Sequence, residues 1–206
     1  MQKLIEGLHH FQSSIFSTQR ELFERLARGQ NPETLFITCS DSRINPNLLT
    51  QTEPGDLFIL RNVANLVPPY EPEGKYHGTS AGIEFAVQGL KVPHLIILGH
   101  SRCGGVAAYR HRVRDKVAER GFIGSWLTML DDLKIDESEI FEFGDETAFE
   151  FASIRSSLAN LRTFPFIKKR EEEGLLSLHG LHFDLASGTL LSLDNDRGSF
   201  TDLHAA

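Results

Sequence analysis

Short apolar runs alternate with helical patterns along most of the chain. Near the N-terminus, apolar residues recur at helical spacing, which predicts two helices ending at Gly29. Runs of apolar residues at 34–38, 57–60 and 94–98 predict short buried strands. Residues 79–90 have helical periodicity, as do those between Ala148 and Leu161. Strands that alternate with helices in this way are typical of βαβ units and a mainly parallel sheet.

The C-terminal part predicts the edge of this sheet. Residues 175–184 and 189–193 read as strands on either side of a Ser-Gly turn, and we expect an antiparallel hairpin there. The predicted fold class is therefore α/β, with a mainly parallel sheet of about four strands, an antiparallel C-terminal edge strand and flanking helices.

One domain is expected over residues 1–206. It would consist of an N-terminal helical arm, residues 1–30, and an α/β core, residues 31–206. No internal repeat or linker interrupts the core. Residues 131–146 are acidic, and we expect them to be exposed and without chemistry.

Composition narrows the class of protein. With 40% hydrophobic and 24% charged residues, the chain has the composition of a soluble globular protein. A formal net charge of -7 argues against nucleic-acid binding as its main role. No apolar run approaches the roughly 20 residues that cross a bilayer, so no membrane association is expected. The first residues lack the apolar stretch of a signal peptide, which favours a cytoplasmic location.

The chain has two cysteines, Cys39 and Cys103, and each follows a predicted strand. A disulfide between them is one interpretation, but a single bridge is unusual in a cytoplasmic protein. Placed beside His100 and Asp41, they look more like metal ligands.

Both cysteines lie in polar segments that directly follow predicted strands. The first strand leads into the segment Cys-Ser-Asp-Ser-Arg at residues 39–43, and the strand at 94–98 leads into Gly-His-Ser-Arg-Cys-Gly-Gly at residues 99–105. Parallel strands deliver their carboxyl ends to one edge of a sheet, where α/β folds build their sites. Cys39, His100 and Cys103 would then form a three-ligand zinc set that leaves a fourth position for water.

Two thiolates would make this zinc centre formally neutral. Its bound water should therefore be less acidic than at a three-histidine centre, and activity should rise with pH above neutrality.

Asp41 lies two residues from Arg43, which would keep the carboxylate ionised. Asp41 could orient a zinc-bound hydroxide, or move onto the metal and close the site. The alternative for this pair is a helix cap with a salt bridge. Gly104 and Gly105 could hold an anion such as bicarbonate at a helix start, or allow tight helix–sheet packing.

The two motifs together resemble those of the β-class carbonic anhydrases. Residues 61–70, Arg-Asn-Val-Ala-Asn-Leu-Val-Pro-Pro-Tyr, also resemble the plant-like (type I) branch of that class. The resemblance implies a lyase that converts carbon dioxide reversibly to bicarbonate and a proton by zinc-bound hydroxide. It implies one Zn²⁺ per subunit, held by Cys39, His100 and Cys103, and a catalytic pair of Asp41 and Arg43.

The resemblance also implies a substrate pocket and a partner. Gln30 and the Gly104 amide match donors to the substrate, and Phe58 and Val63 match apolar residues of the carbon dioxide pocket. Phe85 stands where a tyrosine is common, so one polar contact of that pocket is missing. Related enzymes are obligate dimers whose N-terminal helices wrap the partner, which implies a homodimer or homotetramer here.

A further departure concerns regulation. The bicarbonate-regulated bacterial branch has a Trp–Arg–Tyr triad at a separate site, where this chain has Phe36, Arg61 and Phe183. Only the arginine remains, so we expect no regulation of that kind and an open fourth zinc position at neutral pH.

Two other functions are compatible with the same residues. One is a hydrolase of carbon disulfide or carbonyl sulfide at the same zinc site. The other is a non-enzymatic zinc- or bicarbonate-binding protein. A structural zinc site would need a fourth protein ligand, such as Asp41, His77 or His94, and we expect both histidines to be ordinary surface residues.

Overall fold

The structure is a computed structural model that describes residues 1–74, 77–115 and 121–203. The chain forms two compact units, Met1–Asn31 and Pro32–Ala206.

The first unit is helical, as the apolar spacing predicted. A nearly continuous helical stretch ends at Thr18, and Gln19, with φ of -110°, separates it from a last helix. The rings of Phe11, Phe16 and Phe23 pack on one another with centroids 5.3 to 6.3 Å apart. None of the residues in these helices is buried. The elements are α1 (Gln2–His10), a π-helical turn (Phe11–Ile15), α2 (Phe16–Thr18) and α3 (Arg20–Leu26).

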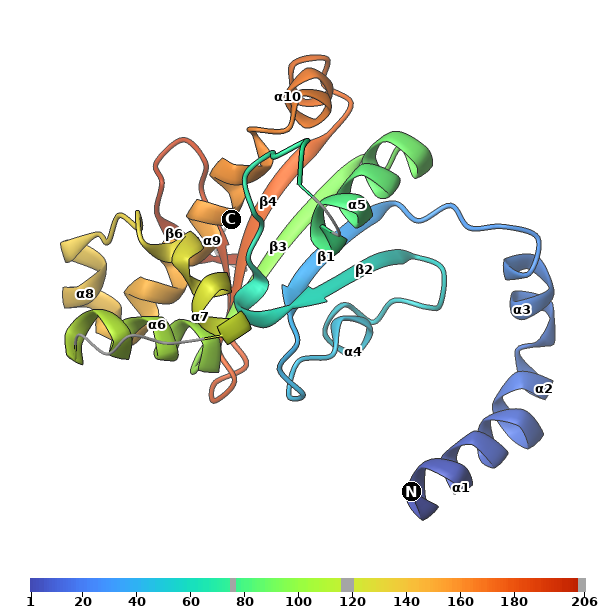
Figure 1. The fold of residues 1–206 in the computed structure, drawn as a ribbon. Helices are drawn as coiled ribbons and strands as arrows, with labels where there is room; N and C mark the ends of the chain where they lie inside the picture. Colours follow the sequence, from blue (N-terminus) through green and yellow to red (C-terminus); the bar gives the residue numbers. More distant parts are fainter. Residues whose placement is uncertain (75–76, 116–120, 204–206) are drawn as a thin grey trace. The chain divides into compact units, whose positions relative to one another are not determined.

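The second unit is built on a six-stranded sheet of order β2-β1-β3-β4-β5-β6 (Figure 1). The first four strands in this order are parallel and the last two are antiparallel. The predicted α/β class is therefore confirmed. The last strand was not predicted, and it takes the edge position beyond the expected hairpin. The strands are β1 (Thr34–Cys39), β2 (Leu57–Asn62), β3 (His94–His100), β4 (Ser177–Phe183), β5 (Leu190–Leu193) and β6 (Phe200–Asp202).

Helices connect the strands and cover the sheet. The helices predicted at 79–90 and 148–161 are present, and the first of them becomes π-helical after Glu84. Helices α7, α8 and α10 were not predicted. The helical elements are α4 (Pro46–Thr50), η2 (Val63–Asn65), α5 (Gly78–Glu84), η3 (Phe85–Leu90), α6 (Gly104–Asp115), α7 (Gly121–Leu127), η4 (Thr128–Leu130), α8 (Glu137–Phe143), α9 (Asp145–Leu161) and α10 (Pro165–Glu172).

Helix α9 lies against β3 and β4 (Figure 1). Its apolar residues Ile154 and Leu158 are buried in the main core. The close approach depends on glycine, because a Cβ at Gly99 would lie 2.7 Å from Ile154. A Cβ at Gly180 would likewise come within 3.0 Å of both side chains. Helix α9 can therefore deliver polar groups directly to the end of β3.

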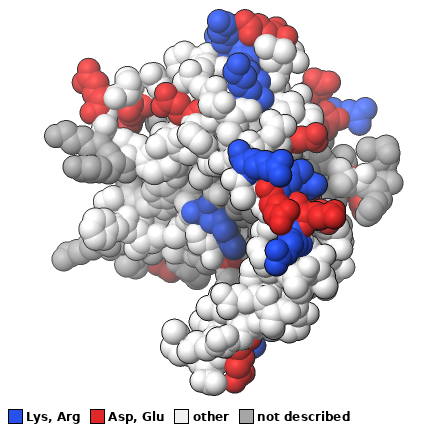
Figure 2. Space-filling model, turned by 90° about the vertical axis from the view of Figure 1, so that its right-hand side faces the viewer, with Lys and Arg blue, Asp and Glu red and all other residues white. Residues whose placement is uncertain are grey.

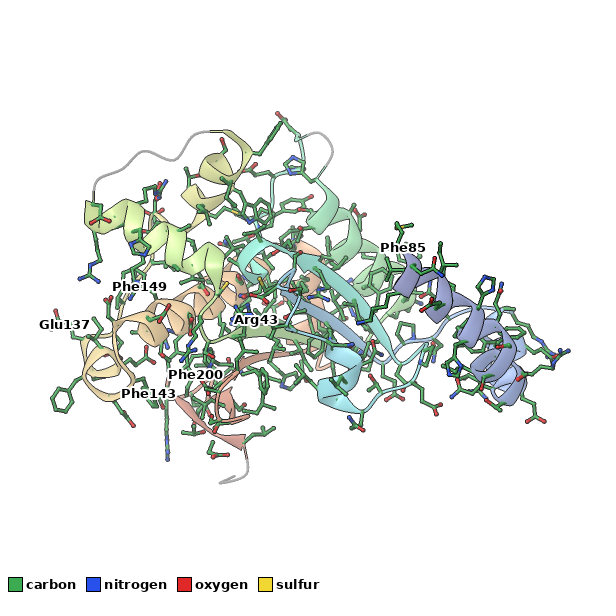
Figure 3. All side chains as sticks on the ribbon, turned by 90° about the horizontal axis from the view of Figure 1, so that it is seen from below. Arg43, Phe85, Glu137, Phe143, Phe149 and Phe200 are labelled. Carbon is green, nitrogen blue, oxygen red and sulfur yellow. The ribbon has the colours of Figure 1, made fainter. Side chains whose placement is uncertain are left out.

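The acidic segment 131–146 is not simply an exposed surface, so that expectation is wrong for Glu139. The Glu139 side chain is buried, and its carboxylate oxygens accept hydrogen bonds of 2.8 and 2.6 Å from Arg155 on α9. The same guanidinium lies over the ring of Phe200 at 5.8 Å. Figure 3 shows Phe143, at the end of α8, close to Phe200 in that view. Glu139 therefore fastens α8 to α9.

On the face drawn in Figure 2, basic and acidic side chains of the described residues lie close together in small groups rather than in one basic patch. No helix among the described residues is long and apolar enough to span a bilayer.

Candidate metal centre

The structure brings Cys39, His100 and Cys103 together at the carboxyl ends of β1 and β3. One potential ligand atom from each residue lies within 4.8 Å of the other two, and the two Sγ atoms are 3.9 Å apart. All three residues are buried. The strands β1 and β3 are paired in parallel register, so their ends coincide, as the sequence predicted.

The orientation of His100 fits a metal ligand. Its Nδ1 lies 2.9 Å from the carbonyl oxygen of Ser101, an acceptor only, so Nδ1 carries the hydrogen. This leaves Nε2 with a lone pair, and that buried atom has no hydrogen-bond partner among the described residues. An unpaired buried nitrogen beside two thiols is costly unless a cation completes the site. The donor set of one nitrogen and two sulfurs fits Zn²⁺.

The electrostatics of the cluster favour ionisation of one of the two thiols. The pKa of Cys39 is lowered, chiefly because the thiol of Cys103 can donate a hydrogen bond to it. The same interaction, together with burial, raises the pKa of Cys103. Burial lowers the pKa of His100, but the proximity of Cys39, the Ser101 carbonyl and the charge of Asp41 outweigh this effect and the net shift is upward. The pair of thiols therefore carries one negative charge readily, and a bound cation would stabilise the second.

Asp41 is held by Arg43 beside this cluster. Its Oδ1 accepts hydrogen bonds of 2.9 Å from both the backbone amide and Nε of Arg43, and its Oδ2 accepts one of 2.6 Å from Nη2. The side-chain hydrogen bonds with Arg43 hold the pKa of Asp41 well below its usual range. Oδ2 lies 3.8 Å from Nε2 of His100. The carboxylate is thus ionised and close to the ligands without belonging to the cluster.

The turn that carries Cys103 is strained. Arg102 has φ of 56°, in the left-handed region, which costs a non-glycine residue about 1–2 kcal/mol. Hydrogen bonds hold the turn in place. Nη2 of Arg43 donates to the carbonyl oxygen of Arg102 at 3.0 Å, and the amide of Ser101 donates to the carbonyl oxygen of Phe183 at 2.9 Å. These bonds attach the turn both to the first motif and to β4.

Two residues beneath the turn were missed by the sequence analysis. The amide of Cys103 donates to Oε1 of Glu150 at 3.2 Å, and Oε2 of Glu150 lies 2.8 Å from Nε2 of His182. Both side chains are buried. A signal was present in the sequence, because Glu150 adjoins the apolar positions of the 148–161 helix and His182 shares the alternating buried positions of its strand with Leu178 and Gly180.

The glycine pair after Cys103 lies at the start of α6. The first of the two begins α6, a position where amides are free to bind an anion. A Cβ at Gly105 would lie 2.7 Å from the side chain of Val63, so close packing requires glycine there. Val63 is 39% exposed and lines a cavity of about 860 Å³. Its carbonyl oxygen accepts a hydrogen bond of 2.8 Å from Nε1 of Trp126.

Phe58 and Phe85 do not reach the cluster within one chain. Phe58 pairs with Leu35, four residues before Cys39, which corresponds to roughly 13 Å along a strand. The ring of Phe85 packs on Phe58 at 5.7 Å and is 52% exposed. Figure 3 shows Phe85 far from Arg43. Gln30 is exposed and belongs to the first unit.

The other polar candidates lie outside the cluster. His94 begins β3, at the opposite end from His100, and His77 precedes α5. Arg61 supports the first motif instead, because Nε donates to the carbonyl oxygen of Cys39 at 3.0 Å and Nη2 to that of Asp41 at 2.7 Å.

A mainly parallel α/β sheet with a Cys-His-Cys group at its carboxyl edge is the arrangement expected of a zinc enzyme. The model of the family described as carbonic anhydrase matches residues 34–190. The chain belongs to this family, in its β class. Its cofactor is zinc, and its reaction is the reversible hydration of carbon dioxide.

Several relatives cover nearly the whole chain. A carbonic anhydrase of Synechococcus elongatus is 35% identical over 98% of this chain and 75% of the relative. One from Pseudomonas aeruginosa is 38% identical over 98% of this chain and 92% of the relative. Among solved structures, the β-carbonic anhydrase CcaA has a TM-score of 0.83 at 37% identity, with 98% and 91% of the two chains covered. A structure from a study of two tetrameric β-carbonic anhydrases of Sordaria macrospora has a TM-score of 0.75 at 29% identity, with 97% and 98% covered.

Proposed function

We propose that this chain hydrates carbon dioxide at a single zinc ion held by Cys39, His100 and Cys103, with Asp41 and Arg43 as the catalytic pair. The observation that carries the proposal is the buried Nε2 of His100, which has no partner among the described residues and faces two thiols. Bound zinc would supply a nucleophile by lowering the pKa of a water molecule. Two thiolates would balance the charge of the cation.

The role of Asp41 follows from its hydrogen bonds. Arg43 occupies Oδ1 with two donors and Oδ2 with only one. Oδ2 therefore keeps a lone pair for a proton donor at the metal centre, 3.8 Å from Nε2 of His100. Because the pKa of Asp41 is lowered, the group acts as an acceptor and orients the nucleophile instead of supplying a proton. Arg43 fixes the direction of that acceptor.

Substrate binding is assigned to the groups around this pair. The Gly104 amide, at the start of α6, would donate to an oxygen of bicarbonate. Val63 offers an apolar surface for carbon dioxide on the wall of the 860 Å³ cavity. An apolar surface, one oriented acceptor and one amide donor would together suit a small uncharged substrate that becomes an anion.

The decisive experiment is stopped-flow carbon dioxide hydration on protein with a measured zinc content, between about pH 6.5 and 9. Hydration should be fast in the zinc-loaded protein and should increase with pH. Removing zinc with a chelator should abolish it, and restoring zinc should recover it. Full zinc occupancy without hydration would overturn the proposal in favour of a sulfur-containing substrate or a binding role.

We also propose that the chain belongs to the plant-like (type I) branch. Phe36 and Phe183 occupy the positions of the regulatory tryptophan and tyrosine, and Arg61 donates to backbone carbonyls of the first motif. Asp41 is engaged by Arg43, which favours an open zinc position at neutral pH. Activity that persists at pH 7 without a steep rise near pH 8 would support this assignment, and a steep bicarbonate-dependent rise would contradict it.

We propose that the working unit is a homodimer or homotetramer. Leu4 and Leu8 on α1 are 64% and 65% exposed, which suits burial against a second copy. Phe58 and Phe85 cannot reach the metal centre of their own chain, so their pocket role requires the centre of a second copy. Gln30 would act in the same way.

Mixed oligomers test this shared site. Asp41→Asn and Phe58→Ala proteins should each be poorly active alone. Co-refolded together, they should regain activity, because some assemblies combine an intact pair with an intact Phe58. Absence of recovery in verified mixed oligomers would contradict a site shared between subunits. Sedimentation velocity would give the size of the assembly.

We also propose a cytoplasmic location for the protein, because both cysteines are free thiols.

A further inference from the structure

The peptide group between Arg102 and Cys103 is held from both sides. Its carbonyl oxygen accepts a hydrogen bond of 3.0 Å from Nη2 of Arg43. Its N–H donates to Oε1 of Glu150 at 3.2 Å. One planar peptide therefore connects the Asp41–Arg43 pair with a buried carboxyl group below the metal centre, and its orientation sets where Sγ of Cys103 points.

Glu150 is itself held by His182. Oε2 of Glu150 lies 2.8 Å from Nε2 of His182, and the two side chains are each 2% exposed. Helix α9 supplies the glutamate, and β4 supplies the histidine, which pairs with Gly99 immediately before His100. The ring of Phe151 packs edge-on against His182 at 5.0 Å and restricts its rotation.

Such a buried pair needs an explanation, because a well-packed apolar pair would serve stability as well or better. The contact that an apolar pair would lose is the one with the Cys103 amide. That amide belongs to a turn with a left-handed Arg102, a conformation that persists only when its surroundings fix it.

We propose that Glu150 and His182 are positioning residues for the metal centre: His182 orients Glu150, and Glu150 fixes the Cys103 turn in its zinc-binding conformation. The inference rests on the proposed zinc site. It concerns hydrogen bonding alone, with Nε2–H of His182 as the donor to Glu150, and requires no change of protonation. Partners of this kind beyond the ligands influence metal affinity strongly.

The test compares two substitutions at one position. His182→Leu keeps the size of the side chain but removes the donor, whereas His182→Gln places an amide N–H near the position of Nε2. Competition with a chelator should give a zinc dissociation constant that rises about 10- to 100-fold in His182→Leu. His182→Gln should recover most of this loss. The absorption spectrum of the Co²⁺-loaded protein should shift in His182→Leu, because a thiolate ligand is displaced, and return toward that of the wild type in His182→Gln.

A double-mutant cycle tests whether the two residues act in series. Glu150→Met should weaken zinc binding at least as much as His182→Leu, and the double variant should lose no more than Glu150→Met alone. Leu161→Ala, a core substitution at the other end of α9, is the control for general destabilisation. It should lower stability while leaving zinc affinity and the Co²⁺ spectrum unchanged.

Three outcomes would overturn the inference. They are wild-type zinc affinity in folded His182→Leu protein, equal losses in His182→Leu and His182→Gln, and losses that multiply in the double variant. Failure of the proposed function is distinguishable from these, because it would appear in the wild-type protein as absent zinc or absent hydration. Circular dichroism on each variant separates loss of zinc from loss of fold.

Discussion

Cys39 and Cys103 reach the same metal centre from segments that are held in different ways. Cys39 is the last residue of β1, where its backbone pairs with Asn62 in the sheet. Cys103 lies beyond the end of β3, after a left-handed residue, and depends on side chains from other elements. One ligand is placed by regular secondary structure and the other by an assembled hydrogen-bond network. The second should therefore be the more sensitive to changes at a distance.

The largest expected effect should be the same in both segments. Cys39→Ser and Cys103→Ser each remove one of three ligands, so zinc content after dialysis should fall below about one tenth of an equivalent. Atomic absorption measures this directly. Full zinc content in either variant would mean that the ligand set is wrong. Serine at the exposed position 42 is unrelated to the metal, and Ser42→Ala serves as the control with normal zinc.

Substitution of Asp41 should lower the rate of hydration without lowering the zinc content. Asp41→Asn should keep zinc but reduce kcat by about 10²-fold or more, because the amide no longer provides an oriented anionic acceptor. Stopped-flow hydration on zinc-quantified protein is the measurement. Asp136→Asn alters an aspartate that caps α8, and it should leave kcat unchanged. Equal rates in Asp41→Asn and wild-type protein would refute the orienting role.

The strain in the Cys103 turn can be measured at Arg102. Glycine adopts the left-handed conformation without cost, and alanine does not. Arg102→Gly should therefore be more stable than Arg102→Ala by about 1 kcal/mol, as measured by urea unfolding of the zinc-loaded proteins. The two variants lack the same side-chain contacts, so the difference isolates the backbone. A more stable alanine variant would show that the turn is not strained.

The smallest effect is expected where β4 meets the turn. Oγ of Ser101 accepts a hydrogen bond from the amide of Leu185, in the hairpin that Asp184 caps. Backbone hydrogen bonds from Ser187 are the main reason that the pKa of Asp184 is lowered to about 2. Asp184→Asn should cost about 0.5 kcal/mol at neutral pH, given its partial exposure.

The pH dependence of this effect has a definite sign. Because the folded-state pKa of Asp184 is lower than the unfolded value, its contribution is present above about pH 4 and is lost as the pH falls through 2. The difference between wild type and Asp184→Asn, measured in metal-free protein by urea unfolding, should therefore shrink at low pH. A difference that grows on acidification would contradict the capping role.

The sequence was sufficient to predict that Cys39, His100 and Cys103 come together, and to predict the sheet that aligns them. Apolar runs ending at Cys39 and shortly before His100 predicted parallel strands, and parallel strands end at one edge. Arg43 could be paired with Asp41 because local spacing alone brings them together. These are short-range signals or simple topological rules, which explains their success.

The hydrogen bonds that hold the Cys103 turn through Glu150 and His182 could not be predicted in the same way. Glu150 and His182 lie 32 residues apart in the chain, and each has a polar type that usually marks an exposed position. Their meeting depends on how closely α9 packs on β3 and β4, where Gly99 and Gly180 allow the close approach. Glu139 was misread for a similar reason, because its partner Arg155 comes from the following helix. Periodicity can place a polar residue on a buried face, but it does not identify a partner that is distant in the chain.

His182, which orients Glu150 beneath the Cys103 turn, comes from β4, and this has a consequence for biosynthesis. All three ligands have been synthesised once residue 103 is added, but His182 follows about 80 residues later, which takes several seconds or more at ordinary translation rates. During that interval the nascent chain carries two thiols and an imidazole without the strand that completes their support. We therefore expect zinc to be retained tightly only after β4 has joined the sheet, late in or after translation.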